Sequence, residues 1–158
     1  MKRNIISGLI IIILVFLSVG GKKSEVLAAG RRSYSINAQN IQGFKKSGGK
    51  LKIKGEKNCI HEVSFSKSEG YKWISSQALK KRSLNFKIAK NCKWKHRDVN
   101  GRITTVSYKL MKKKIKKEQI LYKQYKRSGS STEYETNFSI VLVVQRNRIV
   151  EVVAYGFF

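Results

Sequence analysis

The chain has 158 residues, with 34 lysines and arginines against nine aspartates and glutamates, a formal net charge of +25, and no proline. This length suits one domain, and the charge suits a protein that meets polyanions. The patterns G-x-x-x-x-G-K-[ST], G-x-S-x-G and H-E-x-x-H are absent, and Asp98 is the only aspartate. We therefore expect a non-enzymatic protein that needs no cofactor.

The first 28 residues have the pattern of an export signal. Lys2 and Arg3 precede an apolar run over residues 5–19, and residues 26–28 (Val-Leu-Ala) end in a small residue that a signal peptidase accepts. An uncleaved anchor formed by residues 5–21 is the alternative, although the apolar run is short against the roughly 20 residues that span a bilayer. Cleavage leaves residues 29–158 as one exported basic α+β domain, secreted or on the extracellular face of the cell envelope.

Short alternating runs predict strands in the first half of this domain. Residues 41–46 and 50–54 flank Ser-Gly-Gly, which is typical of a hairpin. In the second run, two apolar residues alternate with Lys50, Lys52 and Lys54, so we expect a lysine row that protects a sheet edge from pairing. Further strands are predicted over residues 60–66 and 71–75.

Two similar segments lie 33 residues apart. Residues 51–59 and 84–92 share Leu, Lys, Lys, Asn and Cys at the same offsets, which predicts two similar strands in one sheet, each ending at a cysteine. In an exported protein Cys59 and Cys92 are a disulfide candidate, and the bridge would stabilise the fold by roughly 3 to 4 kcal/mol. The alternative is two buried free thiols.

A zinc site is a second alternative for the cysteines. Cys59, His61, Cys92 and His96 supply a Cys2His2 set. A single residue separates Cys59 from His61, and structural zinc sites usually separate paired ligands by two or more. We therefore predict no metal site.

The second half predicts one helix between strands. Asn100-Gly101 is a hairpin turn between strands over residues 94–98 and 102–108. Helical spacing over residues 107–122, with Ser107 as N-cap, places Met111 and Ile115 on one apolar stripe. Residues 138–144 and 149–155 form a C-terminal hairpin at the centre of the core, with the helix laid across it. The expected class is α+β, with a mainly antiparallel sheet, one basic amphipathic helix and a C-terminal β-hairpin.

The helix is the best candidate for function. Its lysines are predicted to contact an anionic cell-wall polymer or an anionic membrane surface: Lys112, Lys113, Lys114, Lys116 and Lys117. The alternatives are that these lysines are merely solvated, or that the protein is a secreted membrane-active toxin-like or antimicrobial protein. Nucleic acid is a less favoured partner, because base stacking needs exposed aromatics and Trp73 and Trp94 are expected in the core. The sequence does not predict the oligomeric state.

Overall fold

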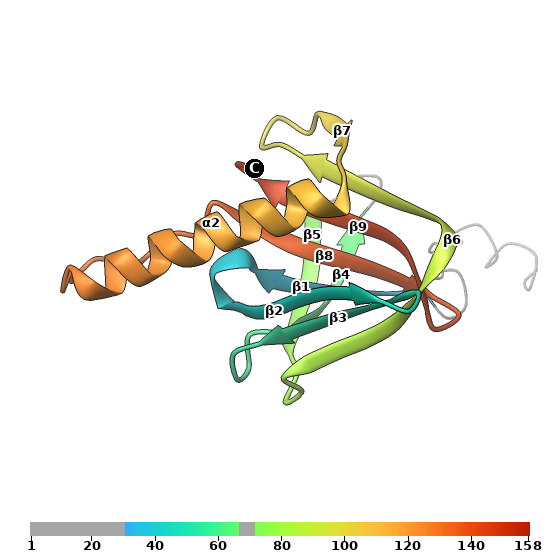
Figure 1. Cartoon of the computed structure of the whole chain (residues 1–158), viewed down its shortest axis with the longest axis horizontal. Helices are drawn as coiled ribbons and strands as arrows, with labels where there is room; N and C mark the ends of the chain where they lie inside the picture. The colour runs from blue at the N-terminus through green and yellow to red at the C-terminus, as the bar shows by residue number, and fades with distance from the viewer. Residues whose placement is uncertain (1–30, 67–71) are drawn as a thin grey trace, which may run out of the picture.

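The computed structural model describes residues 31–66 and 72–158, so the predicted export signal lies outside the described residues. The described chain forms one sheet and one long helix (Figure 1). In chain order the elements are β1 (Arg31–Asn37), the short 3-10 helix η2 (Ala38–Asn40), β2 (Ile41–Ser47), β3 (Lys50–Gly55), β4 (His61–Ser66), β5 (Lys72–Ala78), β6 (Ser83–Arg97), β7 (Ile103–Thr105), α2 (Tyr108–Arg127), β8 (Phe138–Gln145) and β9 (Arg148–Gly156).

The sheet is mixed and mostly antiparallel. Its strand order is β2-β3-β6-β9-β8-β1-β4-β5, with β7 paired to β6, and the β6–β9 pair is parallel. The fold is therefore α+β, as predicted, with one parallel pair that the sequence did not indicate. The C-terminal hairpin, β8 and β9, occupies the middle of this order, which confirms its predicted central place.

The sheet curls around an apolar core. Tyr34 on β1 stacks on Phe86 of β6 with ring centroids 5.6 Å apart, although β8 and β9 lie between those two strands in the sheet. Strand twist and curling bring such distant strands together on the inner face. Helix α2 covers this core, and its Met111 and Ile115 are buried in it (Figure 1).

The start of α2 is defined by local chemistry. The Ser107 side chain accepts a hydrogen bond from the Leu110 amide at 3.1 Å, which is the predicted N-cap. The apolar stripe of Met111 and Ile115 also lies where the spacing placed it. The helix continues to Arg127, beyond the predicted end at residue 122.

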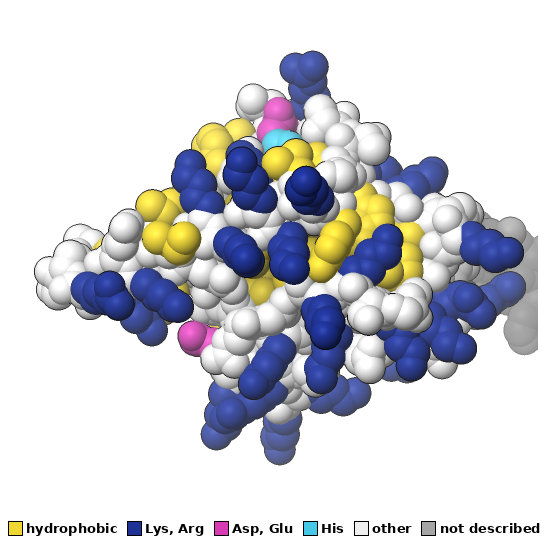
Figure 2. All heavy atoms as spheres, viewed as in Figure 1, with side chains coloured by type: hydrophobic (Ala, Val, Ile, Leu, Met, Phe, Trp, Pro, Cys, Tyr) yellow, Lys and Arg dark blue, Asp and Glu magenta, His cyan; other side chains and the backbone are white. Residues whose placement is uncertain are grey.

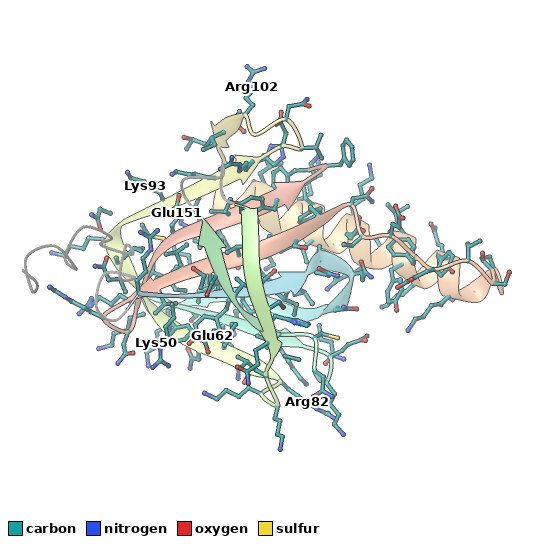
Figure 3. All side chains as sticks on the ribbon, turned by 180° about the vertical axis from the view of Figure 1, so that it is seen from behind. Lys50, Glu62, Arg82, Lys93, Arg102 and Glu151 are labelled. Atoms are coloured by element: carbon teal, nitrogen blue, oxygen red, sulfur yellow. The ribbon has the colours of Figure 1, made fainter. Side chains whose placement is uncertain are left out.

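The central strands are buried on both faces. Ile140 and Leu142 of β8 belong to the core cluster, and Val141 and Val143, whose side chains alternate with them, are buried on the opposite face. The β4–β5 hairpin lies across that rear face in the view from behind (Figure 3). Both faces of β8 are therefore covered, one by the apolar core and the other by the β4–β5 hairpin.

Strand β6 joins two segments that the sequence predicted as separate strands. It runs unbroken over 15 residues, and its bend appears as a register shift against β9 between Ile88 and Lys93. The hairpin at Asn100 follows it as predicted. Its turn is a longer loop in which the Asp98 carboxylate accepts hydrogen bonds from the amides of Asn100 and Arg102, and β7 is only three residues long.

Candidate functional site

Four of the five predicted lysines of α2 are exposed. Lys112, Lys113, Lys116 and Lys117 lie on the helix face turned away from Met111 and Ile115. Lys114 is different: it is half-buried, and its ammonium lies 5.4 Å from the centroid of the Phe158 ring. Lys114 therefore packs against the body of the protein in a cation–π contact.

Two further lysines extend this exposed face. Both are exposed: Lys109 lies three residues before Lys112, and Lys123 lies seven residues, or two helical turns, after Lys116. That spacing is visible in the sequence and could have added both to the predicted set. We use the name lysine face for the exposed lysines of α2 from Lys109 to Lys123: Lys109, Lys112, Lys113, Lys116, Lys117 and Lys123.

Hairpin β2–β3 carries a second group of exposed cations. Lys45, Lys46, Lys50, Lys52 and Lys54 are all exposed. Figure 2 shows basic side chains over the helix and over this hairpin in a single view, with few acidic side chains among them. This view of the molecule therefore presents a strongly positive surface.

Hydrogen bonds fasten α2 to β2. The Tyr108 hydroxyl accepts from the Lys46 amide at 3.0 Å and donates to the Phe44 carbonyl at 3.3 Å. Just past the middle of the helix, the Gln119 side chain donates to the Ile41 carbonyl. The two basic elements are thus held in a fixed relation by bonds near each end of β2.

Trp94 lies beneath this surface in an aromatic cluster. Its ring centroid is 5.6 Å from that of Tyr108 and 6.4 Å from that of Phe44, and both ring pairs are edge-to-face. The Trp94 side chain packs against the core. This agrees with its predicted core position, so Trp94 gives no support to nucleic acid as a partner through base stacking. The side chain of Trp73 lies outside the described residues.

The only acid of α2 is hidden. Glu118 is 2% exposed, and its carboxylate accepts hydrogen bonds from the Tyr134 hydroxyl at 3.0 Å, the Thr136 hydroxyl at 3.5 Å, and the Asn137 amide and side chain at 3.0 and 2.7 Å. Burial, followed by the hydrogen bond to Glu118, raises the pKa of Tyr134 to about 12. Because this carboxylate is buried and fully hydrogen-bonded, no acid of α2 lies at the surface beside the lysine face.

Sequence reasoning missed Glu118, although a signal was present. It follows Met111 and Ile115 at intervals of four and three residues, so it falls on the buried stripe. An acid at such a position needs polar partners. Those partners come from the segment between α2 and β8, and its place beside the helix was not readable from the sequence.

The distal half of α2 projects beyond the sheet (Figure 1). The segment that follows the helix returns along it and places the Tyr134 ring 5.1 Å from Tyr122 and 5.2 Å from Tyr125. On the outside, Lys126 lies 4.6 Å from the Tyr122 ring centroid, and its hydrogen bond with Tyr122 raises the pKa of the ammonium. Packing against a returning segment supports a part of the helix that has no sheet beneath it.

The candidate disulfide between Cys59 and Cys92 is not formed, and the alternative of two free thiols holds. Cys59 and Cys92 are both free thiols and are not at bonding distance. The two similar segments are indeed neighbours in the sheet, but they pair antiparallel, with Leu51 opposite Phe86 and Ile53 opposite Leu84. Antiparallel pairing sends the cysteines that follow them to opposite ends of the pair.

The thiols are also poorly suited to nucleophilic chemistry. Burial raises the pKa of Cys92 to about 11 despite the nearby Lys46, and burial together with Glu56 raises the pKa of Cys59. Because the thiolate is the reactive form, both groups are held in their less reactive state near neutral pH.

The histidines make separate contacts. The His61 Nδ1 atom lies 2.9 Å from the Ser76 hydroxyl, and the His96 Nε2 atom lies 2.8 Å from the Gly156 carbonyl. Among residues 31–66 and 72–158, no three His, Cys, Asp or Glu side chains gather in a way that could hold a metal ion. In the same part of the chain, no helix is both long enough and apolar enough to cross a membrane.

Comparison with known proteins identifies no family for this chain. No family model matches the sequence, and neither the curated proteins nor the solved structures contain a match to it.

Proposed function

We propose that this protein binds an anionic polymer of the cell surface through the lysine face of α2. One observation supports this most directly: α2 buries its apolar stripe and its only acid within the fold, and turns the six lysines of the lysine face to solvent. The proposal that the protein acts outside the cytoplasmic membrane rests on the predicted export signal.

The dimensions of the lysine face suit a repeating anion. Between Lys109 and Lys123 the helix rises about 21 Å, at roughly 1.5 Å for each residue. A polymer with regularly spaced phosphates can contact several lysines along that length and release a counterion at each contact. Binding should therefore be tight at low salt and weaken steeply as salt is added.

The burial of Met111 and Ile115 bears on the membrane-active alternative. A helix that inserts into a bilayer interface needs a free apolar face. In α2 that face is occupied by the core, and only Leu110, Ile120 and Leu121 are apolar and exposed. Surface binding with the fold intact therefore has more support than membrane disruption.

The test compares two variants of equal charge. In the first, four lysines of the lysine face are replaced by glutamine: Lys112, Lys113, Lys116 and Lys117. In the control, four exposed lysines outside α2 are replaced in the same way: Lys80, Lys81, Lys90 and Lys93. Sedimentation with isolated anionic wall polymer at low and moderate salt measures binding.

We expect the helix variant to lose binding and the control to keep most of it. Equal loss in both variants would mean that net charge alone matters, and absence of binding by the natural protein at low salt would end the proposal. Dye leakage from anionic vesicles tests the alternative, because a polymer-binding protein should cause none.

A further inference from the structure

A hollow of about 490 Å³ lies beside the β8–β9 turn. Its lining has four cationic side chains and two amide side chains: Lys50, Lys87, Arg146, Arg148, Asn85 and Asn147. Phe86 adds an aromatic residue. All four cations are exposed, and no carboxylate is among the lining residues.

The strand register creates this cluster. Lys50 on β3 lies opposite Lys87 on β6, and Lys87 lies opposite Arg148 on β9, so three cations form one row across three neighbouring strands. Adjacent strands are about 4.8 Å apart, and residues opposite each other project from the same face. Arg146 joins the row from the β8–β9 turn, where its φ of 49° turns the chain sharply.

This row is not explained by protection of a sheet edge. That explanation, which the sequence suggested for Lys50, applies to strands with an unpaired side. Strands β3, β6 and β9 each pair on both sides, and in the described sheet the ends of the strand order are β2 and β5. Like charges directly opposite each other in a sheet are destabilising, so the arrangement carries a cost that a bound anion would remove.

We propose that this hollow binds a phosphate monoester. Arginine presents paired donors that match phosphate oxygens, and lysine adds point charges, so two of each can neutralise a dianionic phosphate. The volume falls in the range of small-molecule sites, roughly 300 to 1,000 Å³, and exceeds what inorganic phosphate needs. The two asparagine amides would contact the organic part of the ester.

This site is separate from the lysine face. The β8–β9 turn lies at the end of the molecule away from the projecting half of α2 (Figure 1). Small-ligand binding in the hollow and polymer binding on the helix are therefore independent, and each can fail without the other.

Calorimetric titration of the full-length protein with glycerol 3-phosphate, at about 50 mM salt, tests the proposal. The variant is Lys87→Gln with Arg148→Gln. The matched control, Lys81→Gln with Arg82→Gln, also removes one lysine and one arginine, and Figure 3 shows Arg82 well apart from Lys50. Both control residues are exposed and lie outside the hollow.

We expect the hollow variant to bind at least about tenfold more weakly, as the loss of a hydrogen bond to a charged group implies, and the control to change by less than about twofold. Without ligand, the hollow variant should be at least as stable as the natural protein, because it relieves like-charge contacts. The helix variant described above should bind glycerol 3-phosphate normally.

Three outcomes would overturn the proposal. The first is no binding of glycerol 3-phosphate by the natural protein. The second is an equal loss in the control variant, which would indicate diffuse charge attraction. The third is tighter binding of a phosphate diester, such as glycerophosphocholine, than of the monoester. Failure of polymer binding with normal glycerol 3-phosphate binding would count only against the function of the lysine face.

Discussion

Replacement of Glu118 by alanine should weaken the fold strongly, because it leaves several hydrogen-bond donors without their acceptor. The substitution removes an acceptor that serves the Tyr134 hydroxyl and two donors of Asn137 through bonds of 2.7 to 3.0 Å. Tyr134 and Asn137 keep some exposure, so water can satisfy part of the loss, and we assign about 1 kcal/mol to each of the three bonds. The cavity left by the side chain adds about 1 kcal/mol.

The expected loss in the free energy of unfolding is therefore about 4 kcal/mol. Urea denaturation, followed by circular dichroism, measures it; with a slope of about 2 kcal/mol per molar urea, the midpoint should fall by about 2 M. Glu118→Gln keeps the size and one acceptor oxygen, so we expect a smaller loss of about 1 to 2 kcal/mol.

Glu135→Ala is the matched control. Glu135 is an exposed acid near the same segment, and its replacement should change stability by less than about 0.5 kcal/mol. If Glu118→Ala costs no more than this control, the hydrogen bonds around Glu118 do not hold the segment to the helix and the reasoning is refuted.

Three further predictions concern other parts of the fold. Gly156→Ala should cost about 2 to 4 kcal/mol in a thermal melt, because Gly156 has a φ of 114° and an added methyl group would meet the Asn137 backbone. Gly129→Ala should cost less in the same melt, because the φ is 66° and an added methyl group would meet no atom beyond the neighbouring residues within 4 Å. Ser107→Ala should cost about 1 kcal/mol by removing the N-cap, and an unchanged urea midpoint would contradict that role. The raised pKa values of Cys92 (about 11) and Tyr134 (about 12) mean that the folded state keeps both protons at pH values where the unfolded chain loses them. Their stabilisation is complete below their ordinary pKa values, so stability should fall as pH rises from about 9 to about 12; flat denaturation midpoints across that range would count against this.

Several elements could be predicted because their signals are local. The Gly48-Gly49 turn, with φ values of 54° and 69°, needs residues that tolerate positive φ. The Ser107 cap and the stripe of Met111 and Ile115 depend on spacing within one helix. In the candidate site, the same spacing placed four of the five predicted lysines of α2 on its exposed face.

Other features follow from pairing between distant segments. The antiparallel β3–β6 register separates Cys59 from Cys92, and the same register places Lys50 beside Lys87. Parallel pairing of β6 with β9 then adds Arg148 to that row. Neither relation has a local signal, because the same strand sequence can pair with different neighbours, in either direction and in more than one register.

The sequence by itself therefore determined the kinds of elements, their turns and the strong positive charge of this protein. The tertiary structure alone decided which charges stand together, which cysteines stay apart and which polar groups surround Glu118. Side-chain period and turn chemistry act over a few residues, whereas the register of a curled sheet is set by the packing of the whole core.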